Sequence, residues 1–281
     1  MIALTTISRN LEQTAEGVWC SRSRSPISYP EWGNEACFQV EESSFWFRHR
    51  NACIFEAVKL YPPSGPLFDV GGGNGFVAKS MQDAGFEVVL VEPGTVGAGN
   101  ARRRGIQYVV RATLEDAGFL PDSLPAISLF DVVEHMEDDR KFLDTIRFHL
   151  SANGRVYLTV PAYQALWSLE DIAAGHHRRY SRRSIRRLLV ETGFAVEFLT
   201  GFFQFLPPAI FALRVIPFRL GLDISSEAGQ VGSRIRWQHG ISTGWMSGPL
   251  NWIQQREVTR IRRRRQSRFG ASWLVVARKA R

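Results

Sequence analysis

A glycine-rich turn, set between a short apolar run and a stretch with helical spacing, constrains this chain more than any other feature. Residues 67–76 have the sequence LFDVGGGNGF, so that a predicted strand leads into four glycines and then into a helix. Glycines there permit positive φ angles and a close approach of the backbone to a ligand, and the first helical turn offers unpaired N–H groups. The turn therefore predicts a layered α/β fold with a ligand site at the end of this strand.

Strands and helices alternate from this turn onward. Short apolar runs predict seven strands, at residues 67–70, 87–92, 106–110, 126–133, 155–160, 194–200 and 272–278. Helical spacing and capping residues predict helices over 43–60, from the turn to 84, and over 138–150, 181–191 and 248–264. Such alternation requires crossover connections, so we expect a mostly parallel, Rossmann-like sheet with helices on both faces.

The length and composition favour one ordered domain with additions. The 281 residues are 44% hydrophobic and 22% charged, which is an ordinary globular composition. We expect an N-terminal helical extension over 1–42, a main domain over 43–281, and within it a hydrophobic lid or insertion over 201–247, after the sixth strand. The loop at 161–180 is long for such a fold, and long loops are often functional.

An acidic residue, Glu92, ends the second strand, where it can accept both hydroxyls of a ribose. Asp69 and the three alternate glycines give the spacing D-x-G-x-G-x-G rather than G-x-G-x-x-G, because Phe76 occupies the third glycine position of the latter. This difference argues against a nicotinamide cofactor. An acid two residues before the first glycine suits a ligand with a positive amino group better than a pyrophosphate.

These residues resemble motif I of class I S-adenosylmethionine-dependent methyltransferases. VEPG at 91–94 is similar to the end of that family's second strand, LFDVVEHMEDD at 129–139 to its fourth strand and loop, and NGRVYLTVP at 153–161 to its fifth strand. SFWFRHRN at 44–51 and GHHRRYS at 175–181 resemble a bacterial subgroup of methyltransferase-domain proteins. The resemblance covers residues 43–200 and resumes at the last strand. It implies a seven-stranded methyltransferase sheet whose last strand is antiparallel.

The resemblance also implies where S-adenosylmethionine (SAM) binds. Gly71 and Gly73 would lie against its methionine part, and Asp69 would lie near its amino group. The full implied set is Asp69, Gly71, Gly72, Gly73, Gly75 and Glu92, with Thr113 and Leu114 at the adenine and Asp131 and Val132 on the sulfonium side. The family often has Asp where this chain has Thr113, and Glu115 is the alternative partner for the adenine.

Methyl transfer depends on alignment, and it needs a base only where the acceptor must lose a proton. Histidine suits that task because its ordinary pKa lies near neutral pH. His176, in the long loop after the fifth strand, is the expected catalytic residue; alternatively, it anchors the loop together with Arg179. The expected substrate-binding residues are Trp46, Arg50, His135, Arg179 and Tyr180. Trp46 also fits a plain packing role.

The charge distribution disfavours nucleic acid as a partner. The formal net charge is +8, but residues 254–281 carry ten Lys and Arg against one acidic residue, so the remainder is close to neutral. We expect a small-molecule, lipid-linked or sugar-linked acceptor instead.

The apolar run 198–222 and an Arg-rich C-terminal helix, predicted over 256–268, favour a peripheral membrane contact. Prolines and arginines interrupt the apolar run, which argues against a membrane span.

The cysteines and the other potential metal ligands show no recognisable spacing. Cys20, Cys37 and Cys53 form no C-x-x-C pair, which favours a reducing, cytoplasmic setting. No metal site is predicted.

Taken with the resemblance above, the sequence predicts a SAM-dependent methyltransferase, with oxygen as the favoured acceptor atom. Two alternatives remain: a nicotinamide-dependent oxidoreductase, and a non-catalytic peripheral membrane protein that retains a cofactor-binding fold.

Overall fold

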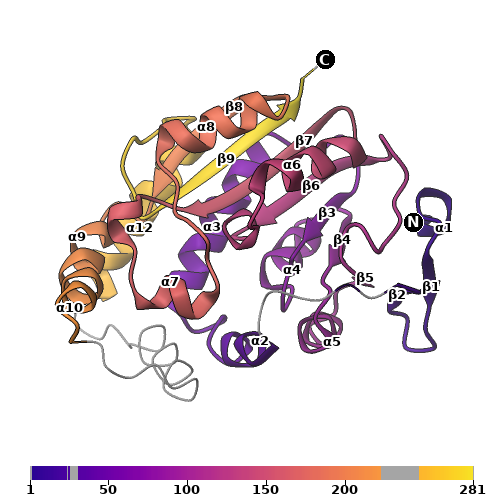
Figure 1. The fold of residues 1–281 in the computed structure, drawn as a ribbon, viewed down its shortest axis with the longest axis horizontal. Coiled ribbons are helices and arrows are strands. Elements are labelled where there is room, and N and C mark those ends of the chain that lie inside the picture. Colours follow the sequence, from indigo (N-terminus) through magenta and orange to yellow (C-terminus); the bar gives the residue numbers. More distant parts are fainter. Residues whose placement is uncertain (1, 24, 26–30, 223–246, 281) are drawn as a thin grey trace.

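The computed structural model describes residues 2–23, 25, 31–222 and 247–280. Within these ranges, nine strands form one mixed sheet in the order β1-β2-β5-β4-β3-β6-β7-β9-β8. Helices pack on both faces of this sheet (Figure 1). The prediction of a Rossmann-like α/β fold is confirmed.

All seven predicted strands are present. They are β3 (Leu67–Val70), β4 (Val88–Val91), β5 (Tyr108–Arg111), β6 (Leu124–Phe130), β7 (Leu150–Pro161), β8 (Phe194–Phe202) and β9 (Ser272–Lys279). β5, β4, β3, β6 and β7 pair in parallel, whereas β9 runs antiparallel between β7 and β8. The expected antiparallel last strand is therefore confirmed.

The N-terminal extension adds two strands to the sheet, which makes nine where seven were predicted. Its elements are α1 (Leu4–Ile7), β1 (Leu11–Gln13), β2 (Trp19–Ser21) and α2 (Glu31–Phe38). β1 and β2 pair antiparallel, and β2 joins the sheet alongside β5. Each of these strands is three residues long, without a fully buried residue. The expected helical extension therefore holds two strands as well as its helices, and strands this short leave no alternating pattern in the sequence.

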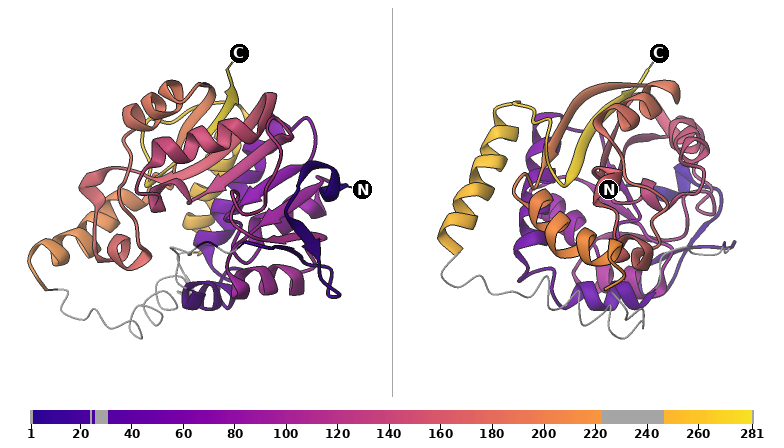
Figure 2. Two further views of the ribbon diagram at one scale, coloured as in Figure 1. Left: turned by 45° about the vertical axis from the view of Figure 1, so that its right-hand side comes forward. Right: turned by 60° about the vertical axis from the view of Figure 1, so that its left-hand side comes forward.

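Alternation along the buried strands divides the core between the two faces of the sheet. The longer helices are α3 (Phe45–Leu60), α4 (Phe76–Asp83), α5 (Thr95–Arg103), α6 (Asp139–His149), α8 (Arg182–Glu191) and α12 (Ser247–Arg262). Phe68 and Val70 of β3 belong to the core that α6 and α8 cover. Leu67 belongs to the opposite core, covered by α3, α4, α5 and α12. Figure 2 shows α12 in yellow alongside α3 on this second face.

The insertion after β8 begins with α9 (Leu206–Ile210), a π-helical turn η3 (Phe211–Val215) and α10 (Ile216–Arg219). Residues 223–246 of the predicted lid lie outside the described residues, and the lid stays a prediction. The Arg-rich helix ends before the expected residue 268: α12 ends at Arg262, and Arg264 has a φ of +57°. In the part of the chain that the structure describes, no helix is both long and apolar enough to cross a membrane.

Candidate active site

The order of the strands places one site at the centre of the sheet. From β3 the chain proceeds to β4 and β5 on one side, whereas β6 and β7 lie on the other side. In open α/β sheets, ligands bind outside the carboxyl ends of the strands at such a switch point. The glycine turn follows β3 and Asp131 follows β6, so both lie at this point.

Gly71 and Gly73 of the glycine turn both have positive φ angles, but their surroundings differ. Gly71 has a φ of +71°, and a Cβ there would lie 2.7 Å from Val132 Cγ2. Gly73 has a φ of +54°, but a Cβ there would meet only Asn34 Oδ1, at 3.5 Å. The turn is therefore packed tightly against the loop after β6 at Gly71, and it has more room at Gly73.

Asp69 is a buried carboxylate on β3. The Ser128 hydroxyl of β6 donates to it at 2.7 Å. Burial raises the pKa of Asp69 to about 6, although the Ser128 hydrogen bond and the Arg50 charge act in the opposite direction. A cationic ligand group beside this carboxylate would favour its ionised form.

Glu92 is buried at the end of β4 and is bonded to the glycine turn. One of its oxygens accepts the N–H of Gly73 at 2.9 Å, and the other accepts the N–H of Gly94 at 2.8 Å. Asp69 and Glu92 thus place two buried carboxylates on neighbouring strands. This pair of acceptors fits a ligand that carries both an ammonium group and ribose hydroxyls, as SAM does.

Asn74 anchors the N-terminal extension on the glycine turn, a role that the sequence did not indicate. Its amide donates to the Asn34 carbonyl of α2 at 2.8 Å and to Glu41 at 3.1 Å. The Asn100 amide of α5 donates to its oxygen at 2.9 Å. α2 therefore packs directly over the turn; the only signal in the sequence was an asparagine among glycines.

Arg50 and Asp131, predicted for the acceptor and the cofactor respectively, form one ion pair. Arg50 Nε donates to Asp131 at 2.7 Å, and the Thr159 hydroxyl donates to its other oxygen at 2.9 Å. Arg50 also donates to the Phe130 carbonyl, and its guanidinium lies 5.6 Å from the centre of the Trp46 ring. α3 is thereby tied to the end of β6, next to Val132.

Thr113 and Leu114, the two predicted adenine contacts, follow β5, the strand that pairs with β4. The Thr113 hydroxyl accepts the Asp116 N–H at 3.0 Å, and Leu114 is buried in the core. The remaining predicted glycines, Gly72 and Gly75, close the glycine turn through a backbone hydrogen bond of 2.9 Å.

The long loop after β7 brings His176 and Arg179 onto one buried carboxylate, Asp171 of α7 (Leu169–Ala174). His176 Nδ1 and Arg179 Nε each lie 2.8 Å from the same Asp171 oxygen. Burial alone would raise the pKa of Asp171, but these two hydrogen bonds and charges lower it. The ring centre of His135 lies 4.8 Å from that of His176, and burial, reinforced by His176, lowers the pKa of His135 to about 4.

Glu134, in the short helix η1 (Val133–His135), is a candidate residue that the sequence reading missed. It is fully buried, and among the described residues neither of its carboxylate oxygens has a hydrogen-bond partner. Burial and the Asp131 charge raise its pKa well above the ordinary value. The ligand atoms of Glu134, His135 and His176 lie within 4.8 Å of one another, a spacing that suits a metal ion. The sequence does not reveal this group, because His176 lies far along the chain from Glu134 and His135.

Tyr180 faces a different part of the molecule. Its hydroxyl donates to Asp139 of α6 at 2.8 Å, and its carbonyl accepts the Trp273 indole N–H at 2.9 Å. Burial and the Asp139 carboxylate raise the pKa of Tyr180. These contacts join the loop to α6 and β9 and give Tyr180 a packing role.

Comparison with known proteins agrees with this geometry. A family model described as a methyltransferase domain matches residues 46–198, more than half of the chain. This chain belongs to that family. The methyl donor of the family is SAM, which favours SAM over the nicotinamide alternative.

The relatives are distant. A ubiquinone biosynthesis O-methyltransferase of Schizosaccharomyces pombe is 26% identical over 138 residues, or 47% of each chain. A probable SAM-dependent methyltransferase of Mycobacterium tuberculosis is 21% identical over 183 residues, or 64% of this chain and 66% of the relative. The chain thus spans 47% to 66% of the length of these curated relatives.

Solved structures show the same fold. A Haloferax volcanii methyltransferase in complex with the Trm112 activator is 16% identical, with a TM-score of 0.56 over 91% of this chain and 98% of that one. Phosphoethanolamine N-methyltransferase 2 of Haemonchus contortus, in complex with SAM, is 17% identical, with a TM-score of 0.54 over 91% of this chain and 58% of that one.

Proposed function

We propose that this protein transfers the methyl group of SAM to an oxygen of a small-molecule, lipid-linked or sugar-linked acceptor. The observation that carries the proposal is the contact of His176 with Asp171 beside the carboxyl end of the sheet. If Nδ1–H donates to the carboxylate, the lone pair of His176 lies on Nε2, which can accept a proton from a hydroxyl. The S. pombe O-methyltransferase relative supports the choice of oxygen.

When bound, SAM supplies an electrophilic methyl group. Asp69 would hold its ammonium group, Glu92 would accept the ribose hydroxyls, and the backbone at Gly71 and Gly73 would lie along its methionine part. The Arg50–Asp131 pair would fix α3 over the sulfonium side. These residues align the reactants, and alignment of this kind can lower a barrier by roughly 7–11 kcal/mol.

The acceptor side combines a base with a residue that positions it. Asp171 would orient the His176 ring and stabilise the cation formed when Nε2 takes up the proton. Arg179, predicted to bind the acceptor, is engaged by the same carboxylate, so its proposed role is to hold Asp171 in place. His135 would line the acceptor beside His176 as a neutral ring.

A lipid-linked acceptor is favoured by the surface that follows β8. The apolar side chains exposed there are Phe211, Leu213, Ile216, Leu220 and Leu222. The run 198–222 holds Arg214 and Arg219 and no acidic residue. An exposed apolar helix with basic residues suits the surface of an anionic membrane. Arg214 itself lies 3.7 Å from Glu170, and Arg262 of the C-terminal segment is likewise paired within the protein, with Glu56.

Calorimetric titration with S-adenosylhomocysteine, with NADH as the control, tests the cofactor half of the proposal. Saturable binding of the first compound alone is expected, and binding of NADH alone would overturn it. Transfer of a labelled methyl group from SAM to an extract then identifies the acceptor by mass spectrometry. A product methylated on nitrogen would contradict the choice of oxygen.

Sedimentation with vesicles that contain anionic lipid tests the membrane surface. Leu213→Asp should reduce the bound fraction at least severalfold, because it places a charge in the apolar face. Val190→Asp on α8 is the matched control, since Val190 is also apolar and exposed. Equal binding by wild type and Leu213→Asp would exclude this surface.

A further inference from the structure

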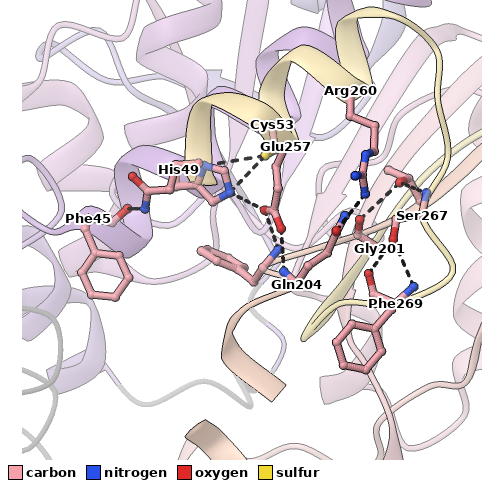
Figure 3. Close-up of polar contacts among 12 residues, drawn as sticks. Phe45, His49, Cys53, Gly201, Gln204, Glu257, Arg260, Ser267 and Phe269 are labelled. Carbon is pink, nitrogen blue, oxygen red and sulfur yellow. Dashed lines mark hydrogen bonds and ion pairs between the residues drawn. The ribbon is translucent and has the colours of Figure 1, made fainter. Parts of the chain in front are cut away.

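A buried cluster outside the proposed site joins the helices α3 and α12. His49 and Cys53 lie one turn apart on α3, and Glu257 lies on α12 (Figure 3). His49 Nε2 is 2.7 Å from a Glu257 oxygen and 3.6 Å from Cys53 Sγ. The three residues are at most 5% exposed. Three kinds of metal-ligating atom therefore converge in the interior of the protein.

The imidazole of His49 cannot donate a hydrogen bond to both of its neighbours from one nitrogen. A neutral imidazole can place a single hydrogen on Nε2, and the 2.7 Å contact directs it to Glu257. The Cys53 thiol is then next to a nitrogen whose hydrogen points elsewhere. A divalent cation at the same point would satisfy the imidazole, the thiolate and the carboxylate together.

We propose that His49, Cys53 and Glu257 bind a zinc ion. Zinc bonds of about 2.0–2.1 Å to nitrogen and about 2.3 Å to sulfur place the two ligand atoms of a tetrahedral site about 3.6 Å apart. This separation matches that of Nε2 and Sγ. The Glu257 oxygen must move away from Nε2 by roughly half an ångström, because two zinc ligands cannot stay at hydrogen-bond distance.

The charges and the ligand types favour zinc in particular. A thiolate and a carboxylate together neutralise a divalent cation, and sulfur and nitrogen ligands select zinc over Mg²⁺ or Ca²⁺. Binding releases the thiol proton of Cys53, while the imidazole hydrogen of His49 moves from Nε2 to Nδ1. One proton is therefore released for each zinc ion bound.

The metal would clamp three segments that are distant in the chain. Glu257 also accepts the N–H groups of Phe203 at 2.9 Å and Gln204 at 2.6 Å, in the turn after β8. These bonds hold the carboxylate toward His49. The next residue along α3 is Arg50, which reaches the end of β6. A bound zinc ion would therefore fix the helix that carries a side chain into the proposed site.

Metal analysis and cobalt substitution test the proposal. Protein purified from zinc-supplemented cells should contain about one zinc ion per chain. Refolding with Co²⁺ in place of zinc should produce a sulfur-to-cobalt charge-transfer band. The band separates this cluster from Glu134, His135 and His176, which offer no sulfur. Cobalt-loaded protein without the band would overturn the proposal.

Matched cysteine variants locate the metal. Cys53→Ala should abolish the band and the gain in Tm on adding zinc, whereas Cys20→Ala and Cys37→Ala should retain both. If Cys53→Ala does not fold, Cys53→Ser keeps a hydrogen-bonding group at the position and serves in its place. A band that survives the loss of Cys53, or that is lost with Cys20 or Cys37, would contradict the assignment.

Discussion

The donor half and the acceptor half of the proposed site are built in different ways. The donor half comprises β3, the glycine turn and Glu92, all within residues 67–92. The acceptor half comprises Glu134, His135, Asp171 and His176, which come from the segments that follow β6 and β7. The first half is shaped by backbone conformation and two carboxylates, whereas the second half consists of side chains assembled across the chain.

This difference teaches what each half tolerates. Backbone geometry at Gly71 is fixed by its φ and by the contact with Val132, so the donor half allows little change. In the acceptor half, the proposed role of Asp171 is to orient a side chain. A substitution in this half should therefore alter the reaction while the cofactor still binds. The predictions below separate the two halves by measuring cofactor affinity and turnover independently.

Removal of the Glu92 carboxylate should have the largest effect. Glu92→Ala leaves the N–H groups of Gly73 and Gly94 without their acceptor and removes the proposed ribose partner. Hydrogen bonds to charged groups contribute about 1.5–3 kcal/mol each, so the Kd for S-adenosylhomocysteine should rise at least about a hundredfold. Glu87→Ala, at the exposed residue just before β4, is the control. An unchanged Kd in titration calorimetry would remove Glu92 from the site.

Loss of the proposed base should lower turnover without weakening cofactor binding. His176→Ala removes the group that accepts the proton, and general bases typically contribute about 10²–10⁴ in rate. We expect kcat to fall about a hundredfold at constant Kd. The exposed neighbour His177 provides a control, His177→Ala. Turnover at the wild-type level would leave His176 as an anchor of the loop.

Cofactor affinity should depend on the protonation of Asp69. Because burial raises its pKa to about 6, this carboxylate gains a proton, and loses its charge, as the pH falls from 7 to 5. Its attraction for an ammonium group falls in the same interval, so the Kd should rise about tenfold. Asp69→Asn should bind weakly and without this pH dependence. A wild-type Kd that is constant between pH 7 and pH 5 would contradict a direct contact.

The smallest effect is expected at Tyr180, which was predicted for the acceptor half. Tyr180→Phe removes only the hydrogen bond to Asp139, so the free energy of unfolding should fall by about 1 kcal/mol. Turnover should stay within about twofold of wild type. A loss of turnover as large as that of His176→Ala would return Tyr180 to the acceptor half.

The sequence predicted the parts of the molecule in which local pattern and structure coincide. The seven main strands and the glycine turn fall into this group, because each is encoded by neighbouring residues. The predicted cofactor-binding residues Asp69, Gly71 and Glu92 lie together at one switch point, again because neighbouring residues in the sequence encode the strands that position them. β1 and β2 were missed because pairing with a neighbour, rather than propensity, makes such short segments extended.

Long-range partnerships could not be predicted. His176 and Arg179 were both selected from the sequence, but nothing there indicated that Asp171 binds both of them. The pairing of Arg50 with Asp131 joins residues from different predicted ligand sites. Glu257 was the single acid in a basic tail, and its burial against His49 becomes visible only when α12 packs on α3.

The position of β9 has a consequence for how the chain folds. Among the described strands, β8 pairs only with β9, and β9 follows all the others in chain order. During synthesis, β8 therefore emerges long before its partner, and β7 presents an open edge for the same interval. Open edges invite pairing with other chains, and such distant pairings form slowly. A nascent chain of this protein should depend on a chaperone until Ser272–Lys279 inserts.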